Sequence, residues 1–247
     1  MDKPYLSVII PAYNEESRIG KTLDAVSGYL KKQDFSSEVI VVSGGSTDRT
    51  VEVARSKASE IPDLSVVAQT KQENRGKGEA VKAGMLRASG TIRLFTDADN
   101  STDIAHFDKM RPLFDEGYDV VIGSRHPWDA AGARQAVSQA WYKRLMGQAG
   151  NLFIQLVAVW GIWDTQCGFK AFRDEAAQKI FSRQRISGWG FDVEALALAR
   201  KFGYRIGIIP VYWINDPVSH VRFSTYFHVL WETVMVRLNL LAKRYAL

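Results

Sequence analysis

The chain has 247 residues, 46% of them hydrophobic, and carries a formal charge of +5 at pH 7. A chain of this length and hydrophobicity can bury a sizeable core, which excludes an intrinsically disordered protein. The small positive charge favours a partner that carries negative charge, such as a nucleotide, a phosphate or an anionic membrane surface. The single cysteine, Cys167, excludes an internal disulfide, and the first apolar run ends at Pro11, too short for a secretion signal. We therefore expect a cytoplasmic protein.

Short β-branched segments alternate with helix-like segments over the first half of the chain. This alternation predicts a doubly wound α/β sheet, which binds ligands at the carboxyl ends of its strands. Beyond about residue 130 the pattern changes to helices and one late strand, and the absence of a linker or repeat predicts one domain. The expected strands cover 5–14, 37–45, 64–69, 91–97, 118–124 and 203–213, and the expected helices cover 15–32, 47–60, 76–88 and 107–117.

Residues 145–163 raise the question of a membrane span, because they contain no charged side chain. Their number is close to the roughly 20 apolar residues that a spanning helix needs. Gln148, Asn151 and Gln155 recur at steps of three and four, which places them on one face of a helix. We expect a buried or interfacial helix rather than a transmembrane one.

The C-terminal residues 226–247 have the pattern of a basic amphipathic helix, which suits a membrane surface. We expect a main domain over 1–225 and a membrane-surface segment over 226–247. The alternative is a terminal helix that packs on the core with its charges in water. The expected polar side carries Glu232, Arg237, Asn239, Lys243 and Arg244, and the expected apolar side carries Leu230, Val234, Leu238, Leu241 and Tyr245.

The strand expected at 91–97 runs directly into carboxylates. Asp97 and Asp99 lie two residues apart at its end, where they could hold a hard divalent cation together with phosphate oxygens and water. The alternative is capping of the next helix, because Ser101, Thr102 and Asp103 follow. The spacing alone does not decide between the two.

Two loops fall at the same edge of the predicted sheet. Arg75 and Lys77, with two flanking glycines, precede the helix expected at 76–88 and can face an anion at its N-terminus. The turn at 44–48 places glycines and small hydroxyls after another strand. Neither loop matches a Walker P-loop or a dinucleotide fingerprint, which disfavours simple ATPase and dehydrogenase functions.

Seven stretches between Leu6 and Arg200 match, in order, the motifs of one family. They are "SVIIPAYNEE", "GGSTDRT", "NRGKGEAVKAGM", "FTDADNST", "DVVIGSR", "DTQCGFKAF" and "WGFDVEALALA". They resemble the family 2 glycosyltransferases of GT-A fold, in particular the polyprenyl-phosphate branch with dolichyl-phosphate β-glucosyltransferase and dolichol-phosphate mannose synthase. The resemblance implies a single α/β GT-A (Rossmann-like) domain with a mostly parallel central sheet, followed by the C-terminal amphipathic helical segment.

The resemblance also assigns roles to residues of this chain. Asp97 would lie near the nucleotide ribose, and Asp99 would bind Mg²⁺ or Mn²⁺ on the diphosphate. Arg125 would face the acceptor phosphate, and Asp192 would orient the sugar or a water. In "DTQCGFK", Asp164, Gln166 and Lys170 would orient the sugar or support the fold, while Cys167 is expected to be buried packing rather than a nucleophile. The donor-binding residues implied are Pro11, Ala12, Tyr13, Glu15, Gly45, Lys77, Asp97, Gln166, His220 and Arg222.

The sequence departs from the family pattern at three places. Ser43 and Gly44 stand where the family usually has an acidic pair before Gly-Ser-Thr-Asp, which leaves the nucleotide base open. The second acceptor-side arginine falls at Lys143, and a lysine of the late active-site loop is replaced by His220, with Arg222 two residues on. Lysine lacks the bidentate fork of arginine, so phosphate binding at Lys143 would have looser geometry.

The reaction implied is inverting transfer of a hexose, from UDP-glucose ahead of GDP-mannose, to the phosphate of a membrane polyprenol such as dolichyl or undecaprenyl phosphate. The enzyme would be peripheral on the cytoplasmic face of a membrane and would bind no nucleic acid. Two rivals stay open: a family 2 enzyme with a hydroxyl acceptor, in which Asp192 is an obligatory base, and a catalytically silent nucleotide-sugar-binding or scaffold protein.

Overall fold

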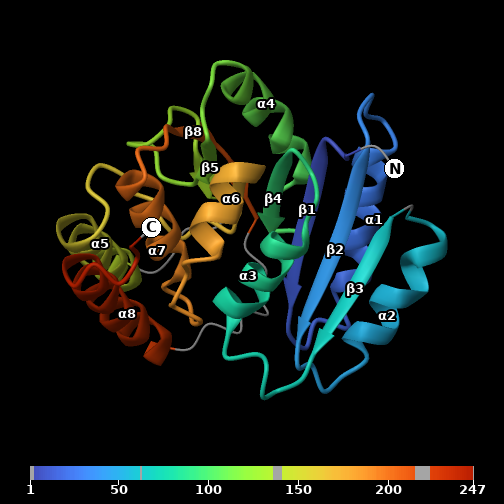
Figure 1. Ribbon diagram of the computed structural model, residues 1–247, viewed down its shortest axis with the longest axis horizontal. Coiled ribbons are helices and arrows are strands. Elements are labelled where there is room, and N and C mark those ends of the chain that lie inside the picture. The colour runs from blue at the N-terminus through green and yellow to red at the C-terminus, as the bar shows by residue number, and fades with distance from the viewer. Residues whose placement is uncertain (1–2, 62, 136–140, 215–222, 247) are drawn as a thin grey trace.

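A seven-stranded sheet forms the centre of the computed structural model, which describes residues 3–61, 63–135, 141–214 and 223–246 (Figure 1). The strand order is β3-β2-β1-β4-β7-β5-β8, and only β7 runs antiparallel to its two neighbours in this sheet. The predicted α/β fold with a mostly parallel sheet is therefore confirmed. The strands are β1 (Leu6–Ala12), β2 (Ser37–Gly44), β3 (Leu64–Gln69), β4 (Ile92–Thr96), β5 (Val120–Ser124), β7 (Phe169–Arg173) and β8 (Ile206–Pro210).

Strand β7 was not among the expected strands, although it lies between β4 and β5 in the sheet. Its sequence, FKAFR, has no β-branched residue, and its Lys170 is fully buried. A lysine in a central strand breaks the apolar run by which buried strands are recognised. A second, two-stranded sheet pairs β6 (Arg134–Gln135) with β9 (Tyr212–Trp213).

Helices cover both faces of the sheet, and each face has its own buried cluster. The alternation of side chains along β1 shows this, because Ile9 joins one cluster while Val8 and Ile10 join the other. One cluster includes residues of α1, α2 and α4, and the other includes residues of α3, α6 and α7. The helices are α1 (Ile19–Leu30), α2 (Thr50–Ser56), α3 (Lys77–Arg87), α4 (Phe107–Asp115), α5 (Trp141–Val157), α6 (Asp174–Phe181), α7 (Phe191–Lys201) and α8 (Phe223–Leu241).

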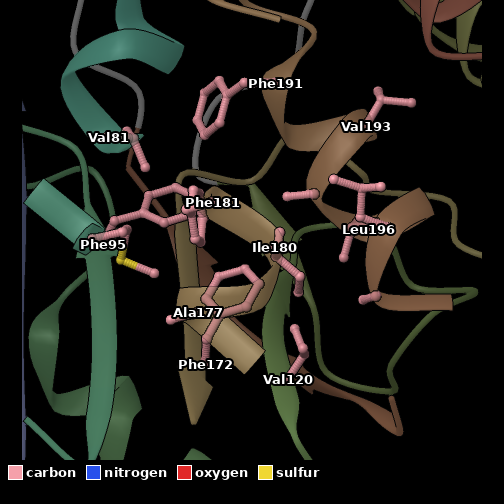
Figure 2. Close-up of a cluster of buried hydrophobic side chains, with 14 of the residues drawn as sticks. Val81, Phe95, Val120, Phe172, Ala177, Ile180, Phe181, Phe191, Val193 and Leu196 are labelled. Carbon is pink, nitrogen blue, oxygen red and sulfur yellow. The ribbon is translucent and has the colours of Figure 1, made fainter. Parts of the chain in front are cut away.

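The cluster under α6 and α7 fixes the position of the first turn of α7. Phe191, the first residue of that helix, is fully buried and packs on Phe95 of β4, with ring centroids 5.6 Å apart (Figure 2). Burying one such side chain stabilises the fold by about 2–3 kcal/mol. Because Phe191 is fixed on β4, the position of the next residue, Asp192, relative to the sheet is fixed as well.

Helices α5 and α8 pack on each other at one end of the molecule, and α8 also contacts α7 (Figure 1). No helix among the described residues is both long and apolar enough to cross a bilayer. The expected division of α8 into faces was wrong in part. Glu232 is partly buried and Asn239 is 4% exposed, although both were placed on the polar side, because α8 turns this side toward α7.

The outward face of α8 is instead apolar. Phe227, Trp231, Leu238 and Leu241 are each at least 50% exposed and follow one another at steps of three, four and seven residues. This spacing places them in one line along the helix. We call these four residues the apolar stripe.

Candidate active site

The loops that follow β1 and β2 are tied to each other by Asn14. Its φ of 55° lies in the left-handed region, which asparagine tolerates better than most residues. The Asn14 N–H donates to the Ser46 hydroxyl at 3.1 Å, and the Asn14 Oδ1 accepts from the Thr47 N–H at 2.8 Å. Glu15 follows, with its N–H donating to the Thr50 hydroxyl at 2.7 Å. The Pro11–Glu15 stretch and the turn at 44–48 therefore form one unit at the carboxyl edge of the sheet.

Lys77 and Asp97 form an ion pair at this edge. The Lys77 Nζ, at the first residue of α3, lies 2.6 Å from Oδ1 of Asp97, just after β4. Burial alone would lower the pKa of Lys77, but the negative charges of Asp97, Asp192 and Asp99 outweigh burial and raise this pKa above its ordinary value. Gly168 makes room for the Asp97 carboxylate, because a Cβ there would lie 2.0 Å from its Oδ2.

The Asp99 carboxylate lies close to the end of β4. One of its oxygens, Oδ1, accepts the Ser101 N–H at 2.9 Å, which leaves Oδ2 for another ligand. Asp97 and Asp99 are both only partly buried, and no group of three metal-ligating side chains occurs among the described residues. Mg²⁺ is commonly bound by one or two carboxylates plus phosphate oxygens and water. The residues present therefore fit a cation that a diphosphate helps to hold.

Arg125 is held by a buried carboxylate. Its Nε and Nη2 donate to Oδ2 and Oδ1 of Asp164 at 2.7 and 2.8 Å, and its guanidinium lies 5.4 Å from the Trp213 ring centroid. Asp164 is positioned in turn by Asp129, which accepts its N–H at 2.8 Å and the Ser124 hydroxyl at 2.7 Å. Burial alone would raise the pKa of Asp164, but the charge and hydrogen bonds of Arg125 lower it. Asp164 thus supports Arg125.

Lys170 and Asp192 form a second ion pair, deeper in the protein. The Lys170 ammonium is fully buried and donates to Asp192 and to the Cys167 carbonyl oxygen. Burial raises the pKa of Asp192 above its ordinary value, although Lys170 and Lys77 oppose this. Both bonds of the Lys170 ammonium are to the protein itself, which favours support of the fold over contact with the sugar. Cys167 is also fully buried, as expected for a packing residue.

The predicted site residues lie at different places along the carboxyl edge of the sheet. Lys77 pairs with Asp97 just after β4, and Arg125 comes just after β5 at the same edge of the sheet. Asp192 pairs with Lys170 near the start of β7, the strand between β4 and β5. Pro11 and Ala12 are buried at the end of β1, Tyr13 is 54% exposed, and Gln166 is partly buried between Asp164 and Gly168. Glu15 accepts from the Arg18 Nε at 2.6 Å, and Gly45 has a φ of 75° in the turn that contacts Asn14.

Three predicted residues lie partly or wholly outside the described part of the chain. The backbone of Lys143 lies in α5, while His220 and Arg222 fall outside the described residues. Their proposed contacts with donor or acceptor stay predictions.

Sequence reasoning missed several residues that position the site residues, including Asp129, Trp189, Trp213 and the spacer Gly168. Trp189 lies against Lys77, with the ammonium 5.3 Å from its ring centroid. An aspartate, a tryptophan or a glycine in a loop carries no local sign of a partner 30 or more residues away. Two of them, Gly168 and Trp189, lie within the family motifs "DTQCGFK" and "WGFDVE", which marked these stretches as part of a site without assigning a role to either residue.

Paired carboxylates, a lysine at a helix start and a clamped arginine, all at the carboxyl edge of an α/β sheet, form an arrangement that can bind phosphate-bearing ligands. The family model of glycosyl transferase family 2 matches residues 7–181. The chain therefore belongs to glycosyl transferase family 2 and is a glycosyltransferase.

Curated relatives cover nearly the whole chain. A dolichyl-phosphate beta-glucosyltransferase of Trichomonas vaginalis is 35% identical over 89% of this chain and 69% of its own length. The human dolichyl-phosphate beta-glucosyltransferase is 34% identical over 96% of this chain and 76% of its own length. Among solved structures, glucosyl-3-phosphoglycerate synthase from Mycobacterium tuberculosis, in complex with Mn²⁺, UDP and phosphoglyceric acid, superposes with a TM-score of 0.69. The superposition covers 99% of this chain and 79% of the synthase chain. The two sequences are 20% identical, so this likeness shows the GT-A-like fold alone.

Proposed function

We propose that the chain transfers glucose from UDP-glucose to the phosphate of a membrane polyprenol, with inversion at the anomeric carbon. The observation that carries this proposal is that Lys77, paired with Asp97 after β4, and Arg125, paired with Asp164 after β5, both lie at the carboxyl edge of the sheet. Lys77 can then bind the phosphates of the donor, and Arg125 can bind the phosphate of the acceptor. The names of the relatives, which are dolichyl-phosphate beta-glucosyltransferases, support this choice of acceptor and sugar.

The donor is bound at the β1 and β2 loops in this proposal. The unit formed by Pro11–Glu15 and the turn at 44–48 receives the nucleotide, and Lys77 and Asp99 lie toward its diphosphate. The choice of uridine over guanosine rests on the resemblance of "DTQCGFK" and "FDVE" to the glucosyl branch. Ser43, where the family has an acidic residue, is engaged with Ser46, its hydroxyl donating at 2.9 Å. We expect calorimetry to give tighter binding of UDP than of GDP, and the reverse order would make GDP-mannose the donor.

Asp99, with Asp97 beside it, would hold Mg²⁺ or Mn²⁺. The cation would neutralise charge on the leaving diphosphate. Lys77 adds a positive charge at the same place, and Asp97 orients the Lys77 ammonium through their ion pair. Replacing Asp99 by Asn should abolish most cation-dependent tightening of UDP binding and most turnover, with the melting temperature unchanged. Full activity in EDTA would contradict this assignment.

The acceptor phosphate lies at Arg125 in this proposal. The pair with Asp164 uses Nε and Nη2, so Nη1 is the guanidinium nitrogen that takes no part in it. A phosphate monoester has a second pKa near 6 and is mostly a dianion at neutral pH, so its attack on the anomeric carbon needs no strong base. Arg125 then positions the nucleophile, and Asp192, held by Lys170, orients the sugar.

The membrane surface contacts the apolar stripe of α8 in this proposal. Leu152, Leu156 and Trp160, at and after α5, add exposed apolar side chains on the neighbouring helix. Arg237 and Lys243 are exposed on and just after α8 and can meet anionic headgroups. A peripheral enzyme seated in this way could take a lipid acceptor from the bilayer.

The decisive experiment is a panel of UDP- and GDP-sugars incubated with polyprenyl phosphate and Mg²⁺ or Mn²⁺, with lipid-linked sugar as the readout. We expect glucose transfer from UDP-glucose. Arg125→Ala should lower kcat/KM for the lipid phosphate by roughly tenfold to over a hundredfold, because a charge-assisted hydrogen bond contributes about 1.5–3 kcal/mol. Donor affinity should stay nearly constant. A defect confined to the donor would contradict the placement of the acceptor.

A hydroxyl acceptor is the second candidate, because Asp192 lies in "FDVE", the motif in which the resemblance places the base of related enzymes with hydroxyl acceptors. The two candidates differ in their response to Asp192→Asn. With a phosphate acceptor the variant should keep measurable turnover, whereas an obligatory base would make it inactive.

A further inference from the structure

The turn at 187–190 connects the site to the C-terminal helix. On one side, the Ser187 hydroxyl donates to Glu79 of α3 at 2.9 Å, and the Ser187 carbonyl oxygen accepts the Glu79 N–H at 3.2 Å. On the other side, the Gly190 N–H donates to Oε2 of Glu232, on α8, at 2.6 Å. Gly190 directly precedes α7, whose second residue is Asp192. One short turn therefore touches α3, α7 and α8.

Two glycines let Glu232 lie directly against this turn. A Cβ at Gly188 would be 2.1 Å from the Glu232 Oε1, and a Cβ at Gly190 would be 2.7 Å from the Glu232 Cβ. Burial raises the pKa of the Glu232 carboxyl, while the Gly190 bond and the His228 charge oppose this. A partly buried carboxylate on a surface helix is unusual unless it has a partner, and here the partner is the backbone of the turn.

Trp189 lies at the centre of the turn and contacts the donor site. Its ring centroid is 5.3 Å from the Lys77 Nζ, which in turn is 2.6 Å from Oδ1 of Asp97. The ring is 37% exposed, so packing around the side chain restrains it less than a core tryptophan would be restrained. The backbone on either side of Trp189 must therefore set much of its position.

We propose that Glu232 is a positioning residue for the donor site, which holds the 187–190 turn so that Trp189 stays against Lys77. It touches no reacting group and acts through the turn. The inference rests on the proposed function in one respect, that Lys77 binds the diphosphate of a nucleotide sugar. Glu232 also follows Trp231 of the apolar stripe, so a single turn of α8 carries both the support of the donor site and an outward apolar side chain.

Three variants test the role of Glu232. Glu232→Ala removes the acceptor of the Gly190 N–H, and Glu232→Gln keeps an acceptor oxygen of nearly the same shape. Gly188→Ala acts from the other side, because its methyl group would displace the Glu232 carboxylate without changing α8. Glu52→Ala, at an exposed glutamate of α2, is the matched control. Melting temperatures establish that each variant is folded.

The first measurement is hydrogen exchange of the Gly190 amide in the protein without nucleotide. Glu232→Ala should speed its exchange by about tenfold or more, as expected for the loss of a hydrogen bond to a charged group, and Gly188→Ala should act in the same direction. Glu232→Gln should restore much of the protection. Unchanged exchange in both Glu232→Ala and Gly188→Ala would overturn the proposal.

The second measurement is the affinity for UDP and for GDP by calorimetry. For whichever nucleotide the wild type binds, Glu232→Ala should weaken binding by about three- to thirtyfold, the range expected when a lysine loses its placement over an aromatic ring. Glu232→Gln should bind nearly as the wild type does. Equal loss in both variants, or no loss in either, would overturn the positioning role. A wild type that binds neither nucleotide would refute the proposed function instead, and the exchange result would still decide whether Glu232 holds the turn.

Discussion

Replacing Asp164 by Asn is the sharpest test of how Arg125 is held. The Asp164 side chain is 8% exposed and that of Arg125 is 23% exposed, so the pair is largely desolvated. Removing one partner of a buried ion pair destabilises a protein by about 3–5 kcal/mol. Asparagine keeps one acceptor oxygen, and part of the guanidinium reaches water, so we expect a smaller loss of about 2–3 kcal/mol.

For a chain of this length, such a loss corresponds to a fall in melting temperature of about 4–12 °C. Differential scanning calorimetry at pH 7 measures it directly. Asp34→Asn is the control, because Asp34 is 85% exposed and lies 3.7 Å from Arg111, a surface pair that should leave the melting temperature within about 1 °C. An Asp164→Asn protein that melts with the wild type would refute the buried-clamp reasoning.

The pH dependence gives a second, independent check. Arg125 makes the pKa of Asp164 lower in the folded than in the unfolded protein, where it is close to 3.8. Its contribution is therefore complete above about pH 4 and is lost as the pH falls toward the lower, folded pKa. The difference in stability between the wild type and Asp164→Asn should be constant from pH 5 to 7 and should shrink below pH 4. A difference that grows in acid would mean that another group is responsible.

Three further predictions concern separate features. Asn14→Ala should lower the free energy of unfolding, measured by urea denaturation, by about 2 kcal/mol, because alanine disfavours the left-handed backbone and cannot make the hydrogen bond to Thr47. Asn14→Gly tolerates that backbone and loses only the hydrogen bond, so its free energy of unfolding should fall by about half as much. Burial, and then the charge of Asp164, raise the pKa of Cys167 to about 12, so a thiol reagent at pH 8 should label it only after denaturation, and rapid labelling of the native protein would contradict this. Replacing Trp231 and Leu238 together by Glu should lower binding to anionic vesicles without changing UDP affinity, and unchanged vesicle binding would remove the apolar stripe from the membrane proposal.

The parallel part of the sheet could be predicted because its strands follow simple rules. β1, β2 and β4 are β-branched or apolar runs with Pro11, Gly44 or Asp97 at or next to their carboxyl ends, and in a parallel sheet these ends share one edge. The closeness of Asp97 to Lys77 was accordingly implied by two motifs at that edge. The family motifs added the acceptor side, which spacing alone would not have identified.

What could not be predicted depends on contacts between distant residues. Glu232 was expected on the water-facing side of α8 because glutamate is usually exposed, and its inward position becomes evident only when α7 places Gly190 beside it. Similarly, Asp164 and Lys170 were ambiguous between sugar binding and support of the fold. Their ion pairs, Asp164 with Arg125 and Lys170 with Asp192, favour support.

The position of β7 has a consequence for the order in which the chain can fold during synthesis. Among the described residues, β1, β2 and β3 find all their sheet partners within β1 to β4, so this part can begin to assemble once residue 96 has been made. β5 is synthesised next but must wait, because the strand that joins it to β4 ends at Arg173. Until then β4 exposes an unpaired edge, the kind of surface that invites wrong pairing and recruits chaperones. The β1 and β2 loops could thus form during synthesis before Arg125 is paired with Asp164, whereas Trp189 and Glu232, which we propose to position Lys77, are added only after β7 is complete.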